Sequence, residues 1–309
     1  MIKNLIIIFL FSGLLSAQMK MDTLDIENYK LMKIKLPDKL KEVSTLGYHT
    51  EHFWSVNDSG GKAELYKINP ENGKIVQTVK IVNAKNMDWE EITFGNKHAF
   101  IGDFGNNDGN RKDLTIYYFP LSVLETNDDE ISVEAKSIEF HFPEQKDFAL
   151  ASNKTDFDCE AMFYYNGKLH LFTKEWLSQK TTHYTLEVKP GNQTAKKIET
   201  FPTNYLVTGA TVDDNPISNT YGFYLIGYTR DGFSLISGFA LPKKKDDILF
   251  PETTAKFSLP LGFVPQLGQT EGIAIKPESP NVLCFSAENF KKKEFHAEQN
   301  IQCIYSLAQ

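Results

Sequence analysis

Apolar and polar residues alternate over short stretches through most of this chain, and Gly, Asn, Asp and Pro interrupt them at short intervals. An alternation with a period of two predicts β-strands, because successive side chains of a strand point to opposite faces of a sheet. After the N-terminal segment, no long stretch has the period of an amphipathic helix. The pattern therefore predicts an all-β protein.

One short pattern recurs five times: a strand that opens with polar side chains, a turn, and a second, more continuously apolar strand. The pairs cover 42–46 with 53–58, 88–94 with 98–103, 158–164 with 169–174, 207–212 with 223–228, and 270–275 with 282–288. The pattern recurs in blocks of about 50 to 70 residues, and such repeats are typical of a β-propeller or a solenoid. Third strands are expected at 63–68, 114–119, 182–188, 233–241 and 302–307, and fourth strands at 74–82, 131–142, 195–201 and 254–259.

The strand count predicts a five-bladed β-propeller with four antiparallel strands in each blade. The last block ends after its third strand, whereas residues 29–37 alternate like an outer strand and precede the first block. We expect this N-terminal strand to complete the last blade and so to close the ring, which removes an open sheet edge. A six-bladed ring, with one blade hidden in the longer second or fourth block, is the alternative.

The first residues have the features of a secretory signal peptide. Lys3 precedes an apolar run over 5–15, and the run ends at Ser16-Ala17-Gln18. The run is too short to span a bilayer, and small residues stand before the expected cleavage point. We expect cleavage of residues 1–17, no membrane insertion of the mature chain, and a single exported domain over 18–309, either periplasmic or secreted. A membrane anchor is the alternative.

The net charge limits the classes of binding partner, and the cysteine positions bear on whether a disulfide forms. The net charge of −7 disfavours nucleic acid and anionic membranes as partners. We expect a monomer that binds a small-molecule ligand or a partner protein. Of the three cysteines, Cys284 and Cys303 fall on neighbouring predicted strands, so both a disulfide and two free thiols remain open. Cys159 is expected to be a structural thiol.

Aligning the blocks on their first strands places four carboxylates at one equivalent position. These are Glu42, Glu90, Glu160 and Glu271, and Thr208 takes the position in the remaining block. Inner strands of a propeller line its central channel, so the four carboxylates should meet at one mouth. Their mutual repulsion requires either protonation or a bound cation. Ca²⁺ suits such an oxygen-only set better than Mg²⁺ because it accepts irregular, higher coordination. The alternative is that these side chains accept hydrogen bonds from backbone amides at strand starts.

A second set of polar residues lies at the ends of the second strands. Antiparallel order brings these ends to the same mouth, and the set contains Asp58, Asp103, Lys174 and Glu288. Either Asp103 or Asp58 could act as a general base toward water. Asn57-Asp58-Ser59-Gly60 and Phe104-Gly105-Asn106-Asn107 are also good turn sequences, so ordinary turn chemistry is the alternative.

The sequence contains no Gly-x-Ser-x-Gly elbow, no phosphate-binding Gly-Lys-Ser/Thr loop and no zinc-spaced histidine pair. Glu271-Gly272-Ile273-Ala274, together with the Asn57 and Gly102-Asp103 turns, resembles exported bacterial propellers of the esterase-like phytase, gluconolactonase and NHL-repeat groups. In gluconolactonase-type propellers a glutamate at the channel mouth helps to bind a divalent ion. The resemblance implies that role for Glu90, Glu160 or Glu271.

Two functions follow as hypotheses. The first is a calcium-dependent hydrolase of a small ester, lactone or phosphoester at the channel mouth. The second is a non-enzymatic propeller that binds a ligand or a partner protein, because propellers host many unrelated functions.

Overall fold

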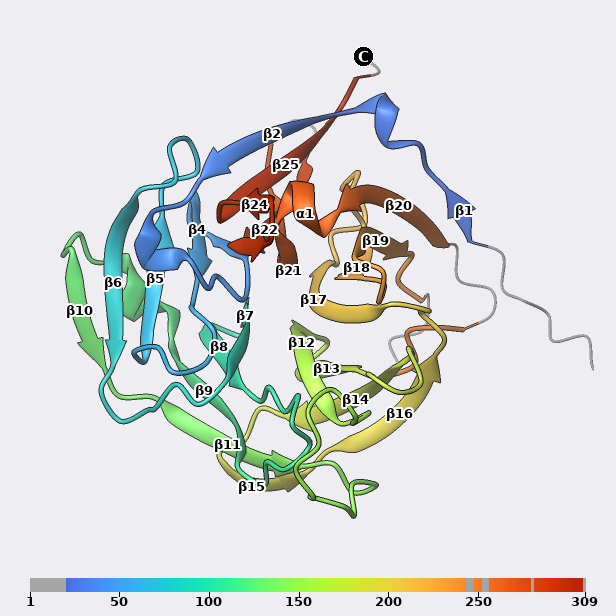
Figure 1. The fold of residues 1–309 in the computed structure, drawn as a ribbon. Helices are drawn as coiled ribbons and strands as arrows, with labels where there is room; N and C mark the ends of the chain where they lie inside the picture. The colour runs from blue at the N-terminus through green and yellow to red at the C-terminus, as the bar shows by residue number, and fades with distance from the viewer. Residues whose placement is uncertain (1–20, 243–246, 252–255, 279–280, 308–309) are drawn as a thin grey trace, which may run out of the picture.

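Five twisted sheets stand in a ring around a common axis (Figure 1). The structure is a computed structural model and describes residues 21–242, 247–251, 256–278 and 281–307. The ring confirms the all-β, five-bladed propeller. The segment predicted as a signal peptide lies outside the described residues. No helix within the described ranges is long and apolar enough to cross a membrane.

Each blade runs outward from an inner strand through three antiparallel neighbours. The first blade consists of β3 (Gly47–His49), β4 (His52–Ser55), β5 (Glu64–Ile68) and β6 (Ile75–Ile81). The second consists of β7 (Trp89–Gly95), β8 (His98–Asp103), β9 (Leu114–Pro120) and β11 (Lys136–His141). The third consists of β12 (Asp158–Tyr165), β13 (Lys168–Lys174), β14 (Thr181–Glu187) and β16 (Lys196–Phe201).

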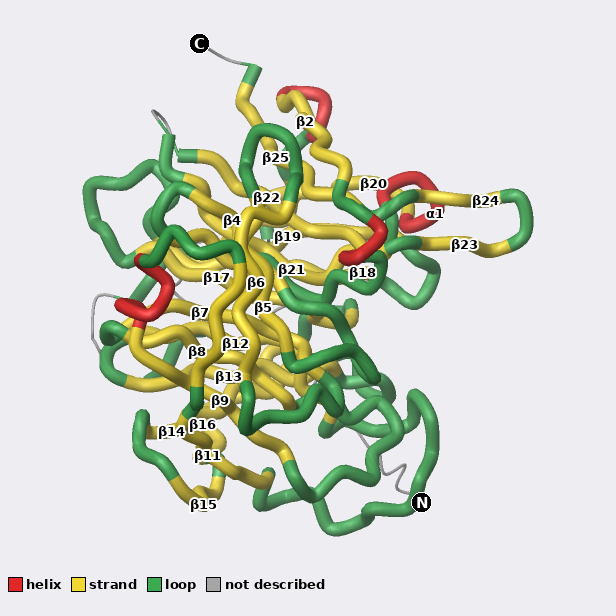
Figure 2. The backbone as a smooth tube through the Cα atoms, turned by 90° about the vertical axis from the view of Figure 1, so that its left-hand side faces the viewer, coloured by secondary structure: helices red, strands yellow, loops and turns green. Residues whose placement is uncertain are grey.

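The last two blades follow the same order. The fourth consists of β17 (Leu206–Asp213), β18 (Gly222–Tyr228), β19 (Phe233–Phe239) and β20 (Lys256–Phe263). A short helix, α1 (Val264–Leu267), leads to the fifth blade, which consists of β21 (Gln269–Lys276), β22 (Val282–Glu288), β25 (Asn300–Ser306) and β2 (Tyr29–Lys35). A hairpin of β23 (Phe290–Lys292) and β24 (Phe295–Ala297) projects from one face of the ring (Figure 2).

The N-terminal strand closes the ring as predicted. β2 pairs antiparallel with β25, and Met32 lies opposite Cys303. On its other side, Cys303 lies opposite Cys284 of β22, and the two cysteines form a disulfide. The last blade is thus held both by a strand from the other end of the chain and by a covalent bond. The sequence had left the disulfide open.

Three blades also carry a short fifth strand, which the sequence did not predict. β10 (Glu130–Val133), β15 (Gly191–Thr194) and β1 (Asp22–Thr23) each add in parallel to an outer strand of a neighbouring blade. The stretch 131–142, predicted as one strand, is therefore divided between two blades. The physical cause is Asn83, whose side chain both donates to the carbonyl of Ala135 and accepts from its amide, so that the chain turns there.

The second strands are buried on both faces because each blade is sandwiched between its neighbours. In β13, Leu171 packs into the cluster shared with the second blade, whereas Phe172 packs into the cluster shared with the fourth. This explains the continuous apolar character that distinguished these strands in the sequence. Packing between neighbouring blades fixes where the inner strands begin. The candidate acidic residues lie at the first residues of these strands.

Candidate functional site: an acidic cavity at one mouth of the propeller

The inner strands share an irregularity at their first residues. The pairing register shifts between Trp89 and Glu91, between Cys159 and Ala161, between Val207 and Gly209, and between Thr270 and Ile273. Glu90, Glu160, Thr208 and Glu271 therefore sit on bulges, where the extra residue is freed from the ladder and its side chain can be re-aimed. This confirms the equivalence of these four positions.

The prediction that Glu42 occupies the equivalent position in the first blade was wrong. Val43 pairs with Asn57 as Trp89 pairs with Asp103, so the first-blade residue equivalent to Glu90 is Ser44, two positions after Glu42. Ser44 lines the cavity at this mouth, whereas Glu42 does not. The side chain of Glu42 is 49% exposed, and its carboxylate lies 3.4 Å from Lys41. A one-residue register shift also occurs in the first blade, between the Val43–Asn57 bridge and the Gly47–Trp54 pair, and Ser44 lies within it. Because Ser44 is not acidic, alignment by residue type selected the nearby Glu42 instead.

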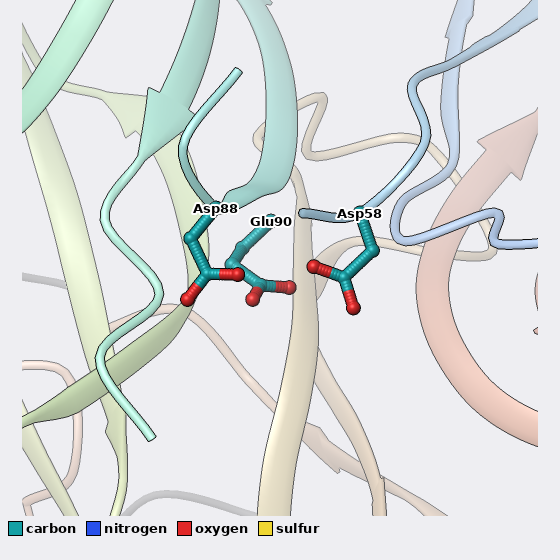
Figure 3. Close-up of side chains that lie close together, drawn as sticks. All are labelled: Asp58, Asp88 and Glu90. Atoms are coloured by element: carbon teal, nitrogen blue, oxygen red, sulfur yellow. The ribbon is translucent and has the colours of Figure 1, made fainter. Parts of the chain in front are cut away.

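Three carboxylates converge between the first and second blades. Asp58, Asp88 and Glu90 each offer an oxygen atom, and these atoms lie within 4.8 Å of one another (Figure 3). Asp58 comes from the turn after β4, whereas Asp88 and Glu90 come from the start of β7. Among the described residues this is the one group of three that could hold a metal ion. We refer to these three residues as the carboxylate triad.

Glu90 is the member of the triad that is least compensated by the protein. It is only 7% exposed, and its carboxylate accepts no hydrogen bond within the described part of the chain. Burial and the neighbouring charges of Asp58 and Glu160 raise its pKa well above the usual value. Burial and Asp58 likewise raise the pKa of Asp88 to about 8. Without a cation, Asp88 and Glu90 are therefore expected to retain protons at neutral pH.

Gly105 packs directly against the triad. A Cβ atom added at this position would lie 2.4 Å from both Oδ2 of Asp88 and Oε1 of Glu90. The backbone amide of Gly105 donates to the carbonyl of Asp88 at 3.2 Å. Only a residue without a side chain allows the backbone to come this close to two carboxylates.

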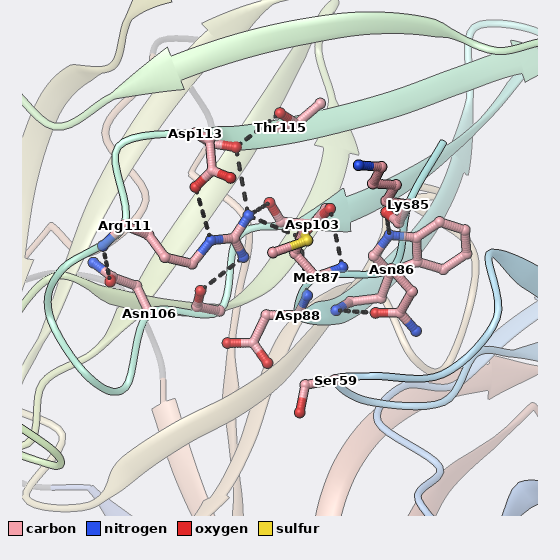
Figure 4. A network of polar contacts seen from close by, with 12 residues as sticks. Ser59, Lys85, Asn86, Met87, Asp88, Asp103, Asn106, Arg111, Asp113 and Thr115 are labelled. Atoms are coloured by element: carbon pink, nitrogen blue, oxygen red, sulfur yellow. Dashed lines mark hydrogen bonds and ion pairs between the residues drawn. The ribbon is translucent and has the colours of Figure 1, made fainter. Parts of the chain in front are cut away.

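Asp103, predicted as a general base, is bound within a network behind the triad (Figure 4). Its carboxylate lies 2.9 Å from Nη2 of Arg111 and accepts the amide of Asp88 at 3.0 Å. Arg111 also donates to the carbonyl of Gly105 at 2.9 Å. Asp103 does not line the acidic cavity. Its geometry is that of a positioning residue, which fixes the turn that carries Asp88.

Glu160 does not join the triad, because it is bound to Lys174. Nζ of Lys174 lies 2.7 Å from both carboxylate oxygens, and each side chain is only 5% exposed. Burial lowers the pKa of Lys174, but the negative charge of Glu160 more than offsets this effect and raises it well above its usual value. The ammonium also lies 4.9 Å from the ring centre of Trp176 and 5.4 Å from that of Tyr228.

Two further carboxyl groups complete the mouth. Oε1 of Glu271 accepts a hydrogen bond from Gln269 at 2.6 Å, and burial raises the pKa of Glu271 to about 8. Burial and the charge of Glu271 raise the pKa of Glu288 to about 9. Both groups can therefore exchange protons near neutral pH.

Together these side chains line a cavity of about 180 Å³, which we call the acidic cavity. Its lining includes two of the triad residues, Asp58 and Glu90, the Glu160–Lys174 pair, and Glu271 with Glu288. Asn107, from the β8–β9 loop of the second blade, and Asn153, from the connection between the second and third blades, also reach it. As predicted, Asp58, Lys174 and Glu288 from the second strands meet the glutamates of the first strands.

A buried glutamate separates this mouth from the rest of the axis. Glu91 accepts hydrogen bonds from the hydroxyl of Thr45, from the amide of Ile92 at 2.9 Å and from the amide of Ala210 at 3.1 Å. Burial raises its pKa to about 8, although these hydrogen bonds act in the opposite direction. One carboxyl group thus ties together the inner strands of three blades.

Sequence reasoning missed Asp88 and Glu91 as functional candidates. Both belong to the quoted Asp88-Trp89-Glu90-Glu91 stretch, and four acidic or aromatic residues before an apolar strand could have indicated that more than one carboxylate faces inward. Which of them does so depends on the bulge.

Comparisons with known proteins do not place the chain in a family. No family model matches the sequence, and no curated protein matches it. Among solved structures, the chain is similar to the major allergen Mala s 1 of Malassezia sympodialis, with 11% sequence identity and a TM-score of 0.49. The similarity covers 89% of this chain and 95% of that one. Membership in the esterase-like phytase, gluconolactonase or NHL-repeat groups stays a prediction.

Proposed function

We propose that this protein binds a divalent cation, calcium, through Asp58, Asp88 and Glu90. The observation that carries the proposal is Glu90: a buried carboxylate without a hydrogen-bond partner, aimed at two further carboxylates. Convergent buried carboxyl groups must either keep protons or be neutralised by a cation, and a cation at this point allows them to ionise. The donors are all oxygen atoms, which favours a hard ion, and their irregular arrangement favours calcium over magnesium.

The activity that we assign to the site is hydrolysis of a small ester, lactone or phosphoester in the acidic cavity. A bound calcium ion supplies Lewis-acid polarisation of a carbonyl or phosphoryl oxygen. The protein supplies proton transfer beside it. Glu271, with a pKa of about 8, can take a proton from water at neutral or alkaline pH in its ionised fraction. Lys174 can stabilise negative charge that develops on the substrate. Asp58, predicted as a general base, serves here as a metal ligand.

Turnover of a panel of lactones, carboxylic esters and phosphoesters, with and without chelator, tests the activity. We expect hydrolysis that requires calcium and that falls at least about a hundredfold in Glu271→Gln, as is typical for loss of a general base. Glu42→Gln is the matched control, because Glu42 is an exposed carboxylate outside the cavity, and it should keep full activity. Hydrolysis that survives both chelator and Glu271→Gln would rule out the assignment.

The size of the cavity favours a second candidate, a non-enzymatic binding propeller. About 180 Å³ is below the usual volume of small-molecule sites, roughly 300–1,000 Å³. On this alternative, calcium organises the loops at the mouth, and these loops contact a ligand or a partner protein. Calcium binding by calorimetry without turnover of any member of the panel, together with one stoichiometric partner recovered from a native envelope fraction, would favour it.

We infer further that the mature protein is exported. The signal-like sequence over 1–17 and the Cys284–Cys303 disulfide support export, since disulfides persist in oxidising compartments. Mass spectrometry of the mature chain from culture medium and from a periplasmic extract tests both the cleavage after Ala17 and the location.

A further inference from the structure

Strand β2 leaves one edge of the fifth blade without a partner. It is the last strand in the sheet order β2-β25-β22-β21, and it lies on the outside of the ring (Figure 1). Within the described residues, no strand pairs with β2 on the side away from β25. The strand that closes the ring is therefore itself an open edge, which offers backbone amides and carbonyls to another strand.

The register with β25 shows which backbone groups of β2 face outward. Leu36 donates its amide to the carbonyl of Gln299, and Leu307 donates its amide to the carbonyl of Asn28. Hydrogen-bonded and non-hydrogen-bonded pairs alternate along an antiparallel ladder, so the even-numbered residues of β2 bond to β25. The odd-numbered residues point their amides and carbonyls away from β25. These residues are Tyr29, Leu31 and Lys33.

The open edge ends at Lys35. A Cβ atom added at Gly73, in the turn between β5 and β6, would lie 2.2 Å from the carbonyl oxygen of Lys35. The ammonium of Lys35 lies 2.7 Å from a carboxylate oxygen of Glu298. The first blade and the start of β25 thus cover this end, and the edge that remains open covers residues 29–34.

The protein itself shows how such an edge accepts a strand. β10, β15 and β1 each add in parallel to the outer strand of a blade. Where β10 adds to β6, Val82 donates its amide to the carbonyl of Val133 at 3.0 Å. In the same pair, Nζ of Lys80 on the outer strand lies 2.6 Å from Oε1 of Glu130 on the added strand. Backbone pairing is therefore combined with an ion pair between an edge lysine and an acidic residue.

The open edge of β2 carries the same kind of lysine. Lys30 and Lys33 are exposed, and neither forms an ion pair with any residue in the described ranges. β2 contains no acidic residue. Like charges that face one another across a strand pair are destabilising, so these lysines oppose pairing with the β2 of a second copy and favour an acidic strand.

Strand β16 is the other outer strand to which no fifth strand is added within the described residues. Its charges are already engaged by the segment 247–251. Lys196 lies 3.3 Å from Asp247, and the amide of Leu249 donates to Glu199 at 2.6 Å. The two outer strands therefore differ, and β2 is the one whose lysines are left for a partner.

We propose that β2 binds an extended acidic segment of a partner protein, which adds to the edge in parallel. The backbone groups of Tyr29, Leu31 and Lys33 pair with the segment, and its carboxylates contact the ammonium groups of Lys30 and Lys33. Main-chain bonds give affinity in this mode of recognition, and side chains give specificity. The site lies on the outside of the ring and depends neither on calcium nor on the hydrolysis proposed above.

Fluorescence anisotropy with a labelled peptide of residues 128–134 of this chain tests the proposal. The peptide is acetylated and amidated, contains the β10 sequence and carries four carboxylates. Its control is the same peptide with each Asp and Glu replaced by Lys. We expect saturable binding of the acidic peptide and no binding of the control. Absence of saturable binding, or equal binding of the two peptides, would overturn the proposal.

Methylation of alternate peptide amides tests the strand pairing without altering the protein. One peptide is N-methylated at Ile131 and Val133, and the other at Glu130 and Ser132. Only one of these sets faces the partner in a paired strand. One methylated peptide should therefore lose binding while the other retains it. Equal effects of the two would show that the contact is not strand pairing.

Charge reversal on the protein locates the peptide. Lys30→Glu/Lys33→Glu replaces attraction by repulsion, and exposed ion pairs of about 0.2–1 kcal/mol each lead us to expect at least about fivefold weaker binding. Lys291→Glu/Lys292→Glu is the matched control, because both lysines are exposed on β23, and it should bind as the wild type does. Circular dichroism and Tm establish that both double variants are folded.

Two further results would overturn the proposal. Binding that falls equally in the two double variants, or that Lys30→Glu/Lys33→Glu leaves unchanged, would place the peptide away from β2. Sedimentation of the wild type alone should give a monomer. A dimer that the acidic peptide dissociates would identify a second copy of the chain as the partner of this edge.

Discussion

The ammonium of Lys174 lies equally close, at 2.7 Å, to both carboxylate oxygens of Glu160, and each side chain is only 5% exposed. The pair divides the carboxylates at this mouth into two groups. Glu160 is neutralised by the protein itself, whereas Asp58, Asp88 and Glu90 have no lysine or arginine bound to them among the described residues. A cation from solution is therefore expected at the triad and not at Glu160.

The buried pair should be strongly coupled in stability. Lys174→Met leaves the Glu160 carboxylate buried without a partner, so we expect a loss of about 3–5 kcal/mol in the free energy of unfolding. The double variant Lys174→Met/Glu160→Gln should recover much of this loss. Urea unfolding of the two single variants and the double variant measures the coupling energy. Additive effects of the two substitutions would show that the pair is not the unit described here.

Calcium should stabilise the folded protein, and more strongly at alkaline pH. The pKa of Asp88 is raised to about 8 and that of Glu90 is raised well above its usual value, so binding near neutral pH must displace protons. The affinity therefore rises as pH increases through about 8. We expect a larger calcium-induced increase in Tm at pH 9 than at pH 6, with about 2.7 kcal/mol of stabilisation at a hundredfold excess over Kd.

Variants separate this calcium response from general salt effects. Glu90→Gln should abolish the increase in Tm, and the exposed Glu42→Gln should retain it. An equal response in the two variants, or a response that falls as pH rises, would contradict binding at the triad.

Gly105→Ala should weaken calcium binding by steric means alone. The new Cβ atom would lie 2.4 Å from oxygens of both Asp88 and Glu90, so the two carboxylates or the loop must move. We expect at least about a tenfold increase in Kd, since about 1.4 kcal/mol is a modest cost for such a displacement. Calorimetry gives Kd, and thermal unfolding in chelator gives the stability without calcium. A variant with unchanged affinity would place the ion away from Gly105.

Glu91 should be a major source of stability along the axis. Glu91→Leu leaves the amide of Ala210 and the hydroxyl of Thr45 without the acceptor that Glu91 supplies, and each unsatisfied buried group costs about 1–3 kcal/mol. The amide of Ile92 loses one bond but keeps its bond to Oγ1 of Thr45 at 3.1 Å. We expect a destabilisation above about 3 kcal/mol in urea unfolding. Glu42→Leu is the control at an exposed carboxylate and should change stability by less than about 0.5 kcal/mol.

The same residue predicts how stability depends on pH. Its folded-state pKa is raised to about 8, whereas in the unfolded chain a glutamate titrates near about 4.3. The folded protein therefore retains a proton that the unfolded chain releases, and this contribution is lost as pH rises from about 4.3 to about 8. In chelator, the wild type should lose stability over this range, and Glu91→Leu should lose less. A wild type that becomes steadily more stable over the range would contradict the raised pKa values.

Closure of the ring by β2 should be essential for solubility. Removal of residues 18–38 deletes the partner of β25 and exposes the edge that carries Cys303. Exposed edges pair with other chains, so we expect aggregation and a lower Tm. Size-exclusion chromatography and thermal unfolding measure both. A truncated chain that stays monomeric with an unchanged Tm would show that the disulfide alone holds the last blade.

The blade count was predictable from sequence because each blade repeats the same local pattern. Strands such as 98–103 and 169–174 are more apolar than the other strands because both of their faces are covered, and this property can be recognised in each segment separately. The closing role of 29–37 followed from the missing outer strand of the last block. The division of 131–142 between two blades did not follow, because it depends on Asn83, which bonds the backbone of Ala135 from 52 residues away.

The sequence by itself determined that this protein is a closed five-bladed propeller with glutamates at the starts of its inner strands. The alternation of apolar and polar residues can be recognised in each segment separately. The strand that covers the open sheet edge follows from the count of these segments. Only the tertiary structure decided that Asp58, Asp88 and Glu90 meet, that Glu160 is bound to Lys174, and that Ser44 stands where Glu42 was expected. In a strand, a shift of one residue turns a side chain to the other face. Bulges and pairing registers therefore determine which carboxylates share one cavity. Contacts between residues far apart in the sequence set these registers.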